Sequence, residues 1–251
     1  MAKTVIVTGA SRGIGLAIAE YLLKTSNNVV VIARSQDALD KLRQRNPEHV
    51  RVLAGDLSDL SLAQKGVDLA AKEFGKLDGL IVNHGILDPV MRLRDTNAED
   101  WKKTFDVNFI SAVAFAKAAL PLLSTSKGCI LFTSSGVSVG AVSTWGAYGA
   151  TKAAMNHFAG QLACEEPNVT SISVRPGVVD TEMQRELREV HSSIMAKKDN
   201  DKFLGLHRDG KLLKPSEPGN VMAKMVLDPP RELNGRFISW ESAELLRYQE
   251  S

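Results

Sequence analysis

Residues Thr4–Gly15 read TVIVTGASRGIG, in which a run of β-branched residues passes directly into three glycines. The run 4–8 predicts a strand buried on both faces, and apolar residues at helical spacing predict a helix from Ile14 to Lys24. Glycines at such a junction let the backbone approach a pyrophosphate closely, and the helix N-terminus adds free N–H groups. The junction therefore predicts a nucleotide site. Its spacing, G-x-x-x-G-x-G, is weak alone, and a plain strand-to-helix turn is the alternative.

The rest of the chain repeats this alternation of strand and helix. Further strands are expected at 28–33, 50–53, 79–83, 130–134, 169–174 and 235–239. Helical patterns separate them, at about 35–46, 60–74, 98–123 and 217–227, with another that carries Tyr148 and ends near Cys164. This alternation predicts an α/β fold with a single Rossmann-type, doubly wound parallel sheet and helices on both faces. The length of 251 residues suits one domain over residues 1–251.

A polar, charged segment from Asp180 to Lys214 interrupts the alternation. It has an irregular pattern and is longer than an ordinary connection between two elements. We therefore expect residues 180–214 to form a lid over the substrate.

Composition excludes several classes of protein. There are 31 basic and 29 acidic residues, a net charge of +2, and no basic cluster with interleaved aromatics indicates nucleic-acid binding. Cys129 and Cys164 have no metal-ligand spacing, so we expect no metal, a reducing compartment and an inert thiol at Cys129. A strand pattern directly follows Met1-Ala2-Lys3, and no apolar run reaches about 18 residues. We expect no signal peptide, no membrane span and a cytoplasmic protein.

The end of the second strand bears on the choice of nucleotide. An NAD site usually has an acid there to hold the ribose 2′-hydroxyl, but this end reads Ile32-Ala33-Arg34-Ser35. Arg34, together with Arg12 of the glycine junction, can instead clamp a 2′-phosphate. The missing acid and the two cations favour NADP(H), against the alternative of two ordinary surface arginines.

The sequence Tyr148-Gly149-Ala150-Thr151-Lys152 predicts acid–base chemistry. A Tyr and a Lys four residues apart lie on one face of a helix, and a neighbouring ammonium lowers the pKa of a phenol. Such a pair can exchange a proton with a carbonyl or an alcohol. Because Y-x-x-x-K is common, an exposed Lys beside a half-buried Tyr is the alternative unless other motifs support the pair.

Other motifs do support it, and over about residues 4–180 they resemble the short-chain dehydrogenases/reductases. Thr8–Gly15 is similar to the family's T-G-x-x-x-G-I-G, and Asn83-His84-Gly85 is similar to its Asn-Ala-Gly after the fourth strand. Asn108 matches the family's helix Asn, and Ser135 precedes Tyr148 by thirteen residues, a spacing typical of the family. Segments 134–136, 145–148 and 176–184 are further similar to the benzil-reductase branch of fungi and bacteria, which is close to the sepiapterin reductases.

The resemblance implies an oxidoreductase that uses NADPH to reduce a ketone, a diketone or an aldehyde. The catalytic residues it implies are Asn108, Ser135, Tyr148 and Lys152. The cofactor contacts that follow from the motifs are Gly9, Ser11, Arg12, Gly13, Ile14, Arg34, Asp56, Leu57, Asn83, Gly85, Tyr148, Lys152, Pro176, Gly177, Val179 and Thr181. The substrate candidates are Ser135, Val137, Ala141, Trp145, Tyr148 and Val178, with Met183 and Leu187 of the lid.

In the implied mechanism, Tyr148 donates its phenolic proton and Ser135 hydrogen-bonds the carbonyl oxygen. Lys152 lowers the pKa of Tyr148 and holds the nicotinamide ribose, while Asn108 holds a water that relays protons. Each assignment has a structural alternative: Ser135 as a turn residue, Asn108 as a satisfied buried amide, and Trp145 as a packing residue under the lid.

Two positions depart from the family pattern. His84 replaces the usual Ala, and its imidazole either lines the crevice or packs against it. Ser239 stands where sepiapterin reductases have an Asp that grips the pterin. A sepiapterin-type pterin reductase and a non-catalytic NADPH-binding regulator are the alternative functions. The resemblance also suggests a homo-oligomer, a dimer or tetramer, built through the long helices that begin near Ala98 and Tyr148.

Overall fold

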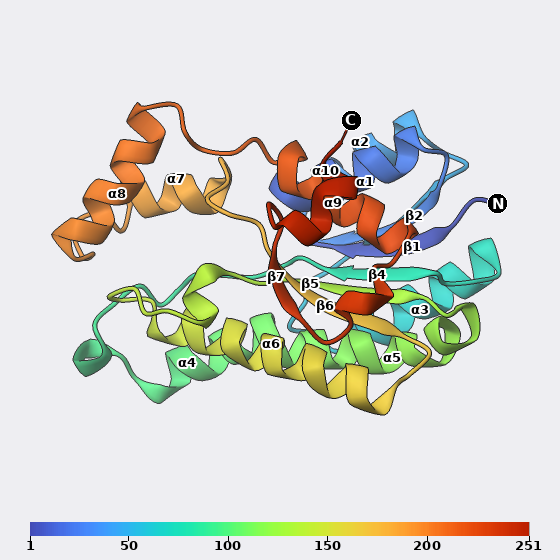
Figure 1. The fold of residues 1–251 in the computed structure, drawn as a ribbon, viewed down its shortest axis with the longest axis horizontal. Helices are drawn as coiled ribbons and strands as arrows, with labels where there is room; N and C mark the ends of the chain where they lie inside the picture. Colours follow the sequence, from blue (N-terminus) through green and yellow to red (C-terminus); the bar gives the residue numbers. More distant parts are fainter. Residues whose placement is uncertain (251) are drawn as a thin grey trace.

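A computed structural model describes residues 1–250, and they are built around one sheet of seven parallel strands. The strands lie in the order β3-β2-β1-β4-β5-β6-β7 (Figure 1). Their bounds are β1 Thr4–Thr8, β2 Asn28–Ala33, β3 Val50–Ala54, β4 Gly79–Val82, β5 Cys129–Thr133, β6 Thr170–Arg175 and β7 Phe237–Ser239. The predicted strands are confirmed, with differences of about one or two residues at their ends.

Helices cover both faces of the sheet, which confirms the doubly wound pattern. Their bounds are α1 Gly13–Lys24, α2 Gln36–Arg45, α3 Ser61–Phe74, α4 Ala98–Phe105, α5 Ser111–Ser126, α6 Gly146–Glu165, α7 Glu182–Glu189, α8 Lys197–Arg208, α9 Ser216–Leu227 and α10 Leu246–Gln249, with short 3-10 turns at 93–95, 136–138, 231–233 and 243–245. The side chains of β1 alternate between the two layers of helices on either face of the sheet. Val5 and Val7 join the core with α1 and α9, whereas Ile6 joins the core with α3 and α5.

The carboxyl ends of β1 and β4 mark the place where a ligand is expected. From β1 the sheet extends through β2 and β3 on one side and through β4 to β7 on the other. The winding therefore reverses between β1 and β4, and sheets of this kind bind ligands outside the strand ends at such a reversal. The glycine junction follows β1 and Asn83 follows β4, so both lie at this edge.

The long helix expected at 98–123 is interrupted by a π-helical turn. Asp106–Ile110 forms this turn between α4 and α5, and it contains Asn108. Turns of this kind occur frequently at functional sites. By length and composition the joined helix Ala98–Ser126 could cross a membrane. A core helix passes the same test, and Phe115 and Leu123 of this one are fully packed against the sheet.

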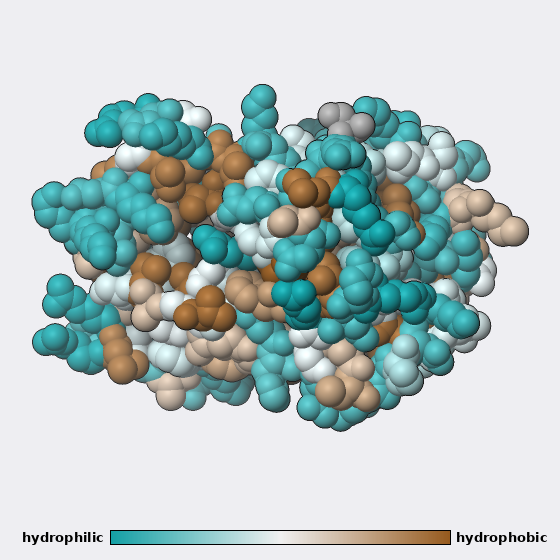
Figure 2. Space-filling model, viewed as in Figure 1, coloured by the Kyte–Doolittle hydropathy of each residue, from teal (hydrophilic) through white to brown (hydrophobic). Residues whose placement is uncertain are grey.

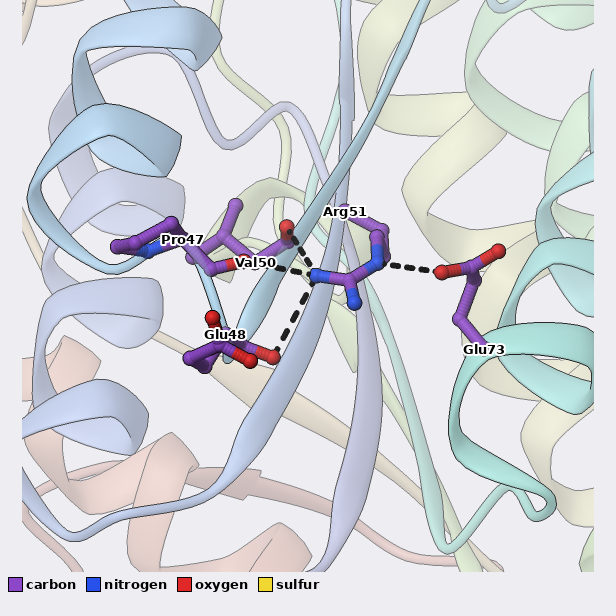
Figure 3. A network of polar contacts seen from close by, with 5 residues as sticks. All are labelled: Pro47, Glu48, Val50, Arg51 and Glu73. Atoms are coloured by element: carbon purple, nitrogen blue, oxygen red, sulfur yellow. Dashed lines mark hydrogen bonds and ion pairs between the residues drawn. The ribbon is translucent and has the colours of Figure 1, made fainter.

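Arg51 ties the edge strand β3 to its neighbours (Figure 3). Its Nε donates to Glu73 Oε2 of α3 at 2.8 Å, and its Nη1 donates to Pro47 O at 2.9 Å and Val50 O at 3.0 Å. The guanidinium also lies over the Phe74 ring, 5.0 Å from the centroid. A charged side chain on an edge strand discourages pairing with another chain, and Arg51 has this effect at β3.

The segment 180–214 is helical, which corrects the irregular pattern expected from the sequence. It forms α7 and α8, which lie together at one end of the molecule (Figure 1). Leu213 N donates to Val178 O at 3.0 Å and Asp180 N donates to Leu213 O at 2.8 Å, so the segment leaves and returns at one point. The sequence hid these helices because each is short and polar, with little more than Leu187 in α7 and Phe203 in α8 packed inward.

Candidate active site

The glycine junction has the backbone that close approach of a ligand requires. Gly9 and Gly13 have φ angles of +66° and +57°, in the left-handed region. A Cβ on Gly9 would lie 3.0 Å from the Cα of His84, so the loop packs tightly on the segment after β4. Within residues 1–250, the N-cap residue Arg12 makes no side-chain cap to α1, which leaves first-turn N–H groups for an anion. The predicted cofactor residues here, Gly9, Ser11, Arg12, Gly13 and Ile14, share this loop and the first helical turn.

Asn83 connects the carboxyl ends of three neighbouring strands by hydrogen bonds. Its backbone N–H donates to Thr8 Oγ1 at 3.0 Å, and its Nδ2 donates to Gly9 O at 3.4 Å. Its Oδ1 accepts from Thr133 Oγ1, at the end of β5, at 3.1 Å. Asn83 thus uses its backbone and both ends of its amide to connect the ends of β1, β4 and β5.

Arg34 and Asp56 lie at the carboxyl ends of the paired strands β2 and β3. Asp56 Oδ1 accepts from the N–H and the hydroxyl of Ser58, at 2.9 and 2.8 Å. These bonds, and then the positive charge of Arg34, lower the pKa of Asp56. Arg12 and Arg34 are both exposed, while Leu57 is buried directly after Asp56. The structure therefore leaves both guanidinium groups accessible beside the edge that carries the glycine loop.

Asn108 is fully buried and its amide is satisfied by the protein. Its Oδ1 accepts from the N–H of Ile86 at 2.8 Å, and its Nδ2 donates to Ile86 O at 2.9 Å and to Thr151 Oγ1 at 3.2 Å. Thr151 Oγ1 in turn donates to Tyr148 O at 2.7 Å. Asn108 therefore connects the segment after β4 to the helix that carries Tyr148. This is the structural alternative that the sequence left open, and the water relay stays a prediction.

Lys152 extends from α6 toward the carboxyl end of β5. Its Nζ donates to Thr133 O at 2.6 Å and lies 5.6 Å from the centroid of the Tyr148 ring. A Cβ on Gly85 would lie 3.3 Å from Asn108 Oδ1 and 3.7 Å from this Nζ, so the two predicted catalytic side chains meet at Gly85. Burial lowers the pKa of Lys152 to about 8.

Tyr148 has its pKa shifted in the direction opposite to the sequence prediction. Burial raises the pKa of Tyr148 to about 12, and a hydrogen-bonding interaction with the Ser135 side chain counters this only in part. The expected lowering by Lys152 is wrong here, because removing the phenolate from water dominates and the Lys152 ammonium is bonded to Thr133 O. The phenol is consequently held in its neutral, proton-donating form at neutral pH.

Ser135 lies where β5 passes into the turn Gly136–Ser138. Its Oγ accepts from the N–H of Val137 at 3.4 Å, which is the contact of a turn residue. The same side chain interacts with Tyr148. Ser135 is therefore a turn residue and a neighbour of the phenol at once.

Apolar side chains surround Tyr148 and form a cluster separate from the two cores of the sheet. Its members are Leu87, Val90, Val137, Val142, Trp145, Tyr148, Val178, Met183, Leu187, Met195 and Phe203. The Trp145 ring meets Tyr148 edge to face, with centroids 6.0 Å apart, and stacks on Phe203 at 5.4 Å. The substrate candidates Val137, Trp145, Val178, Met183 and Leu187 are thus brought together, whereas Ala141 is exposed and lies outside the cluster.

The segment 180–214, which the sequence predicts to be a lid, covers this cluster from outside. Leu187 of α7, Phe203 of α8 and Met195 between them are buried against it. The outer surface of the lid is apolar in places, since Val190 is 63% exposed and Leu204 is 41% exposed. Figure 2 shows hydrophobic residues gathered on the viewed face around α7.

The segment after β6 runs between the glycine loop and the lid. Gly177 has a φ of +79°, and the Thr181 Cγ2 lies 3.2 Å from the position of a Cβ on Gly13. Val179 forms a bridge with Leu213 at the point where the lid returns. The predicted cofactor residues Pro176, Gly177, Val179 and Thr181 therefore border both features.

His84 is buried and hydrogen-bonded at both ring nitrogens. Its Nδ1 lies 2.7 Å from Thr8 Oγ1, and its Nε2 lies 2.7 Å from Ser111 Oγ and 3.0 Å from Val107 O. Because Ser111 Oγ donates its own proton to Val107 O, it must accept from Nε2–H. Nδ1 faces the Thr8 hydroxyl, which also has Ile81 O as a partner at 3.3 Å, and Nδ1 accepts from this hydroxyl when the imidazole is neutral. Burial, and next the charge of Lys152, lower the pKa of His84 to about 3. Of the two sequence alternatives, His84 packs beneath the crevice.

This burial predicts a pH-dependent stability difference for His84→Gln. The unfolded imidazole binds a proton below its ordinary pKa of 6.5, but the folded one binds it only below about 3, so acid favours unfolding between these values. At about pH 7.5 the free energy of unfolding of the variant should be lower than that of the wild type by about 1–3 kcal/mol, because the variant loses hydrogen bonds. At about pH 5 the gap should narrow by about 2 kcal/mol.

Urea unfolding at the two pH values measures this gap, with His157→Gln, an exposed histidine of α6, as the control for loss of an imidazole. A gap that stays constant or widens in acid would show that His84 is charged in the folded protein.

Comparison with known proteins agrees with this geometry. Residues 3–192 match the short chain dehydrogenase family. The chain belongs to the short-chain dehydrogenases. It is an oxidoreductase of that family and acts on a small-molecule substrate. It is 40% identical to the "Uncharacterized oxidoreductase YIR035C" of Saccharomyces cerevisiae over 98% of each chain, and the crystal structure of that protein superposes with a TM-score of 0.97 over 99% of this chain and 100% of that one.

Two other relatives of this short-chain dehydrogenase add detail. The "Benzil reductase ((S)-benzoin forming) IRC24" of Saccharomyces cerevisiae is 38% identical over 98% of each chain. A solved structure described as a cytoplasmic protein with unknown function, also from Saccharomyces cerevisiae, is 38% identical, with a TM-score of 0.85 over 99% of this chain and 100% of that one.

Several residues of this short-chain dehydrogenase site are missing from the sequence-based candidates. Thr8 acts through its hydroxyl, and Thr133 acts through its hydroxyl and its carbonyl, at strand ends where sequence patterns carry no signal for such contacts. Phe203 lies in the polar segment 180–214, where the sequence pattern does not indicate a buried aromatic residue. Asn156 had a usable signal, because it follows Lys152 at the same four-residue spacing by which Lys152 follows Tyr148.

Proposed function

We propose that this short-chain dehydrogenase is an NADPH-dependent carbonyl reductase that acts on ketones, diketones or aldehydes, with Tyr148 as the proton donor. The observation that carries the proposal is the position of the phenol. Tyr148 is neutral and buried, it contacts Ser135, and Lys152 and Asn108 lie beside it at the edge that carries the glycine loop. A proton donor at that edge suits reduction of a carbonyl group.

The residues at the strand ends fit NADP. Gly9 and Gly13 let the loop pack closely on His84 and Thr181 in a left-handed conformation, and the N-terminus of α1 attracts an anion. Arg34 and Arg12 are exposed cations at the end of β2 and in the loop, where a 2′-phosphate would need them. When bound, NADPH supplies the hydride. The predicted residues of the loop, of β4 and of 176–181 would hold it.

The chain's own residues supply orientation and a proton. Tyr148 Oη gives its proton to the oxygen that develops negative charge, and the raised pKa of this phenol keeps the proton in place until then. Ser135 Oγ donates a hydrogen bond to the same oxygen and fixes its angle. Lys152 would hold the ribose hydroxyls of the bound cofactor and would return a proton to Tyr148 after the reaction. Asn108 holds the helix turn that carries Tyr148 and Lys152.

The cluster around Tyr148 supports a bulky, apolar substrate. Trp145, Leu187 and Phe203 offer aromatic and aliphatic surface and exclude water when the lid is closed. The name of the benzil reductase relative points to an aryl diketone of the same character. We therefore favour aryl ketones and diketones over pterins, whose recognition needs an acid where this chain has Ser239.

A cofactor-oxidation assay tests the proposal. Purified protein should oxidise NADPH in the presence of benzil and convert it to benzoin, with much less turnover of sepiapterin. Faster reduction of sepiapterin would support the pterin-reductase alternative. Tight NADPH binding without turnover of a panel of ketones, diketones and aldehydes would support the regulator alternative and refute the reductase.

Location and assembly complete the proposal. We place the enzyme in the cytoplasm, as one yeast neighbour is described. We also expect a dimer or tetramer built through the long helices, because only 39% of the most apolar window of Ala98–Ser126 is buried within one chain. Sedimentation at micromolar concentration measures this, and a monomer would refute it.

A further inference from the structure

A chain of hydrogen bonds joins helix α6 to both sides of Ser135. Ser134 Oγ donates to Asn156 Oδ1 at 2.6 Å, and Asn156 Nδ2 donates to Ser138 Oγ at 2.8 Å. Ser138 Oγ then donates its proton to Ser135 O at 2.6 Å. The amide of Asn156 therefore holds the residue before Ser135 with one end and, through Ser138, the carbonyl of Ser135 with the other.

The orientation of the Asn156 amide is fixed by its partners. The single proton of Ser138 Oγ goes to Ser135 O, so this oxygen can only accept from Asn156, and only an NH₂ group satisfies it. The other end must then be the carbonyl oxygen, which accepts from the buried hydroxyl of Ser134. Neither Asp nor a hydrophobic residue can make both contacts.

Asn156 also shares a rigid element with the phenol. Tyr148, Lys152 and Asn156 are spaced four residues apart along α6 and lie on one side of it. Tyr148 thus approaches Ser135 from the same helix that holds the backbone on either side of Ser135. We infer that Asn156 is a positioning residue, which sets the Ser135 hydroxyl against Tyr148 and against the substrate carbonyl.

This inference rests on the proposed function, and it predicts a loss confined to the reaction step. Asn156→Ala should lower kcat for benzil by about 10- to 100-fold, because small displacements of a group that aligns the reacting atoms cost that much. The affinity for NADPH should stay within about two-fold, since Ser135 orients the carbonyl and not the cofactor. Asn156→Asp keeps the acceptor and loses the donor, so it should recover little.

Ser138→Ala tests the same connection from its other end. It leaves Asn156 and its bond to Ser134 in place, and it removes the hydroxyl that accepts from Asn156 Nδ2 and donates to Ser135 O. The backbone N–H of Ser138 still donates to Ser135 O at 3.1 Å. It should lower kcat in the same direction by a smaller factor, and it keeps the inference testable if Asn156→Ala fails to fold. Asn46→Ala is the matched control, because this asparagine donates to Leu42 O at the end of α2, far from the site.

A double-mutant cycle with Ser135→Ala decides whether Asn156 acts through Ser135. In the Ser135→Ala background, Asn156→Ala should change kcat by less than about two-fold, because there is no hydroxyl left to position. An equal loss in both backgrounds, or no loss in the wild-type background, would overturn the inference. Its failure is distinct from failure of the proposed function, which would appear as an absence of carbonyl reduction by the wild-type protein.

Discussion

Tyr148→Phe is expected to lower kcat for carbonyl reduction by about 10²- to 10⁴-fold, the usual contribution of a positioned general acid. The phenolic hydroxyl group, which carries that proton, is the only part of the side chain that the substitution removes. Its loss should lower kcat and kcat/KM by the same factor, because the bond is made as charge develops on the substrate oxygen. The variant should still fold, since Ser135 keeps its contact with Val137 and the ring keeps its packing on Trp145.

Tyr21→Phe is a close control for this experiment. Tyr21 lies on α1 with Lys224 Nζ 5.8 Å from its ring centroid, an arrangement similar to that of Tyr148 and Lys152 but outside the site. Turnover of this variant should match the wild type, while fluorescence titration should give both variants the wild-type affinity for NADPH. Turnover retained by Tyr148→Phe would remove the proton-donor role.

Replacing Arg34 is expected to change the choice of cofactor. Arg34→Ser should raise KM for NADPH by about 10- to 100-fold, the effect of losing one charge-assisted hydrogen bond to a phosphate, and leave KM for NADH nearly unchanged. Arg34→Asp should go further and prefer NADH. An acid at the end of β2 repels the 2′-phosphate and holds the 2′-hydroxyl.

Arg43→Ser is the matched control, because Arg43 is another exposed arginine of the same region but is paired with Asp40 on α2. Its ratio of kcat/KM for NADPH to that for NADH should equal the wild-type ratio. A wild-type enzyme that uses the two cofactors equally would contradict the roles given to Arg34 and Arg12, and would leave the catalytic assignments standing.

The two predictions depend on information of different kinds. The role of Arg34 is inferred from its position directly after the second strand. In a doubly wound sheet, the position of a strand also determines where the residue that follows it lies. The state of Tyr148 is not readable in this way. The spacing to Lys152 predicts a lowered pKa, but burial raises the pKa of Tyr148 to about 12. The lid residues that help to bury the phenol, Leu187, Met195 and Phe203, are 39 to 55 positions away in the sequence.

The sequence by itself determined the strands, their parallel order of winding and the glycine junction, because hydrophobic period and glycine placement act over short stretches of chain. It also singled out Ser135, Tyr148 and Lys152 as a group of candidate catalytic residues. Only the tertiary structure decided how these groups are held. The π turn at Asn108, the neutral imidazole of His84 and the amide of Asn156 each satisfy partners from different elements. Hydrogen-bond geometry and desolvation depend on which distant groups meet, and that is settled when the layers pack.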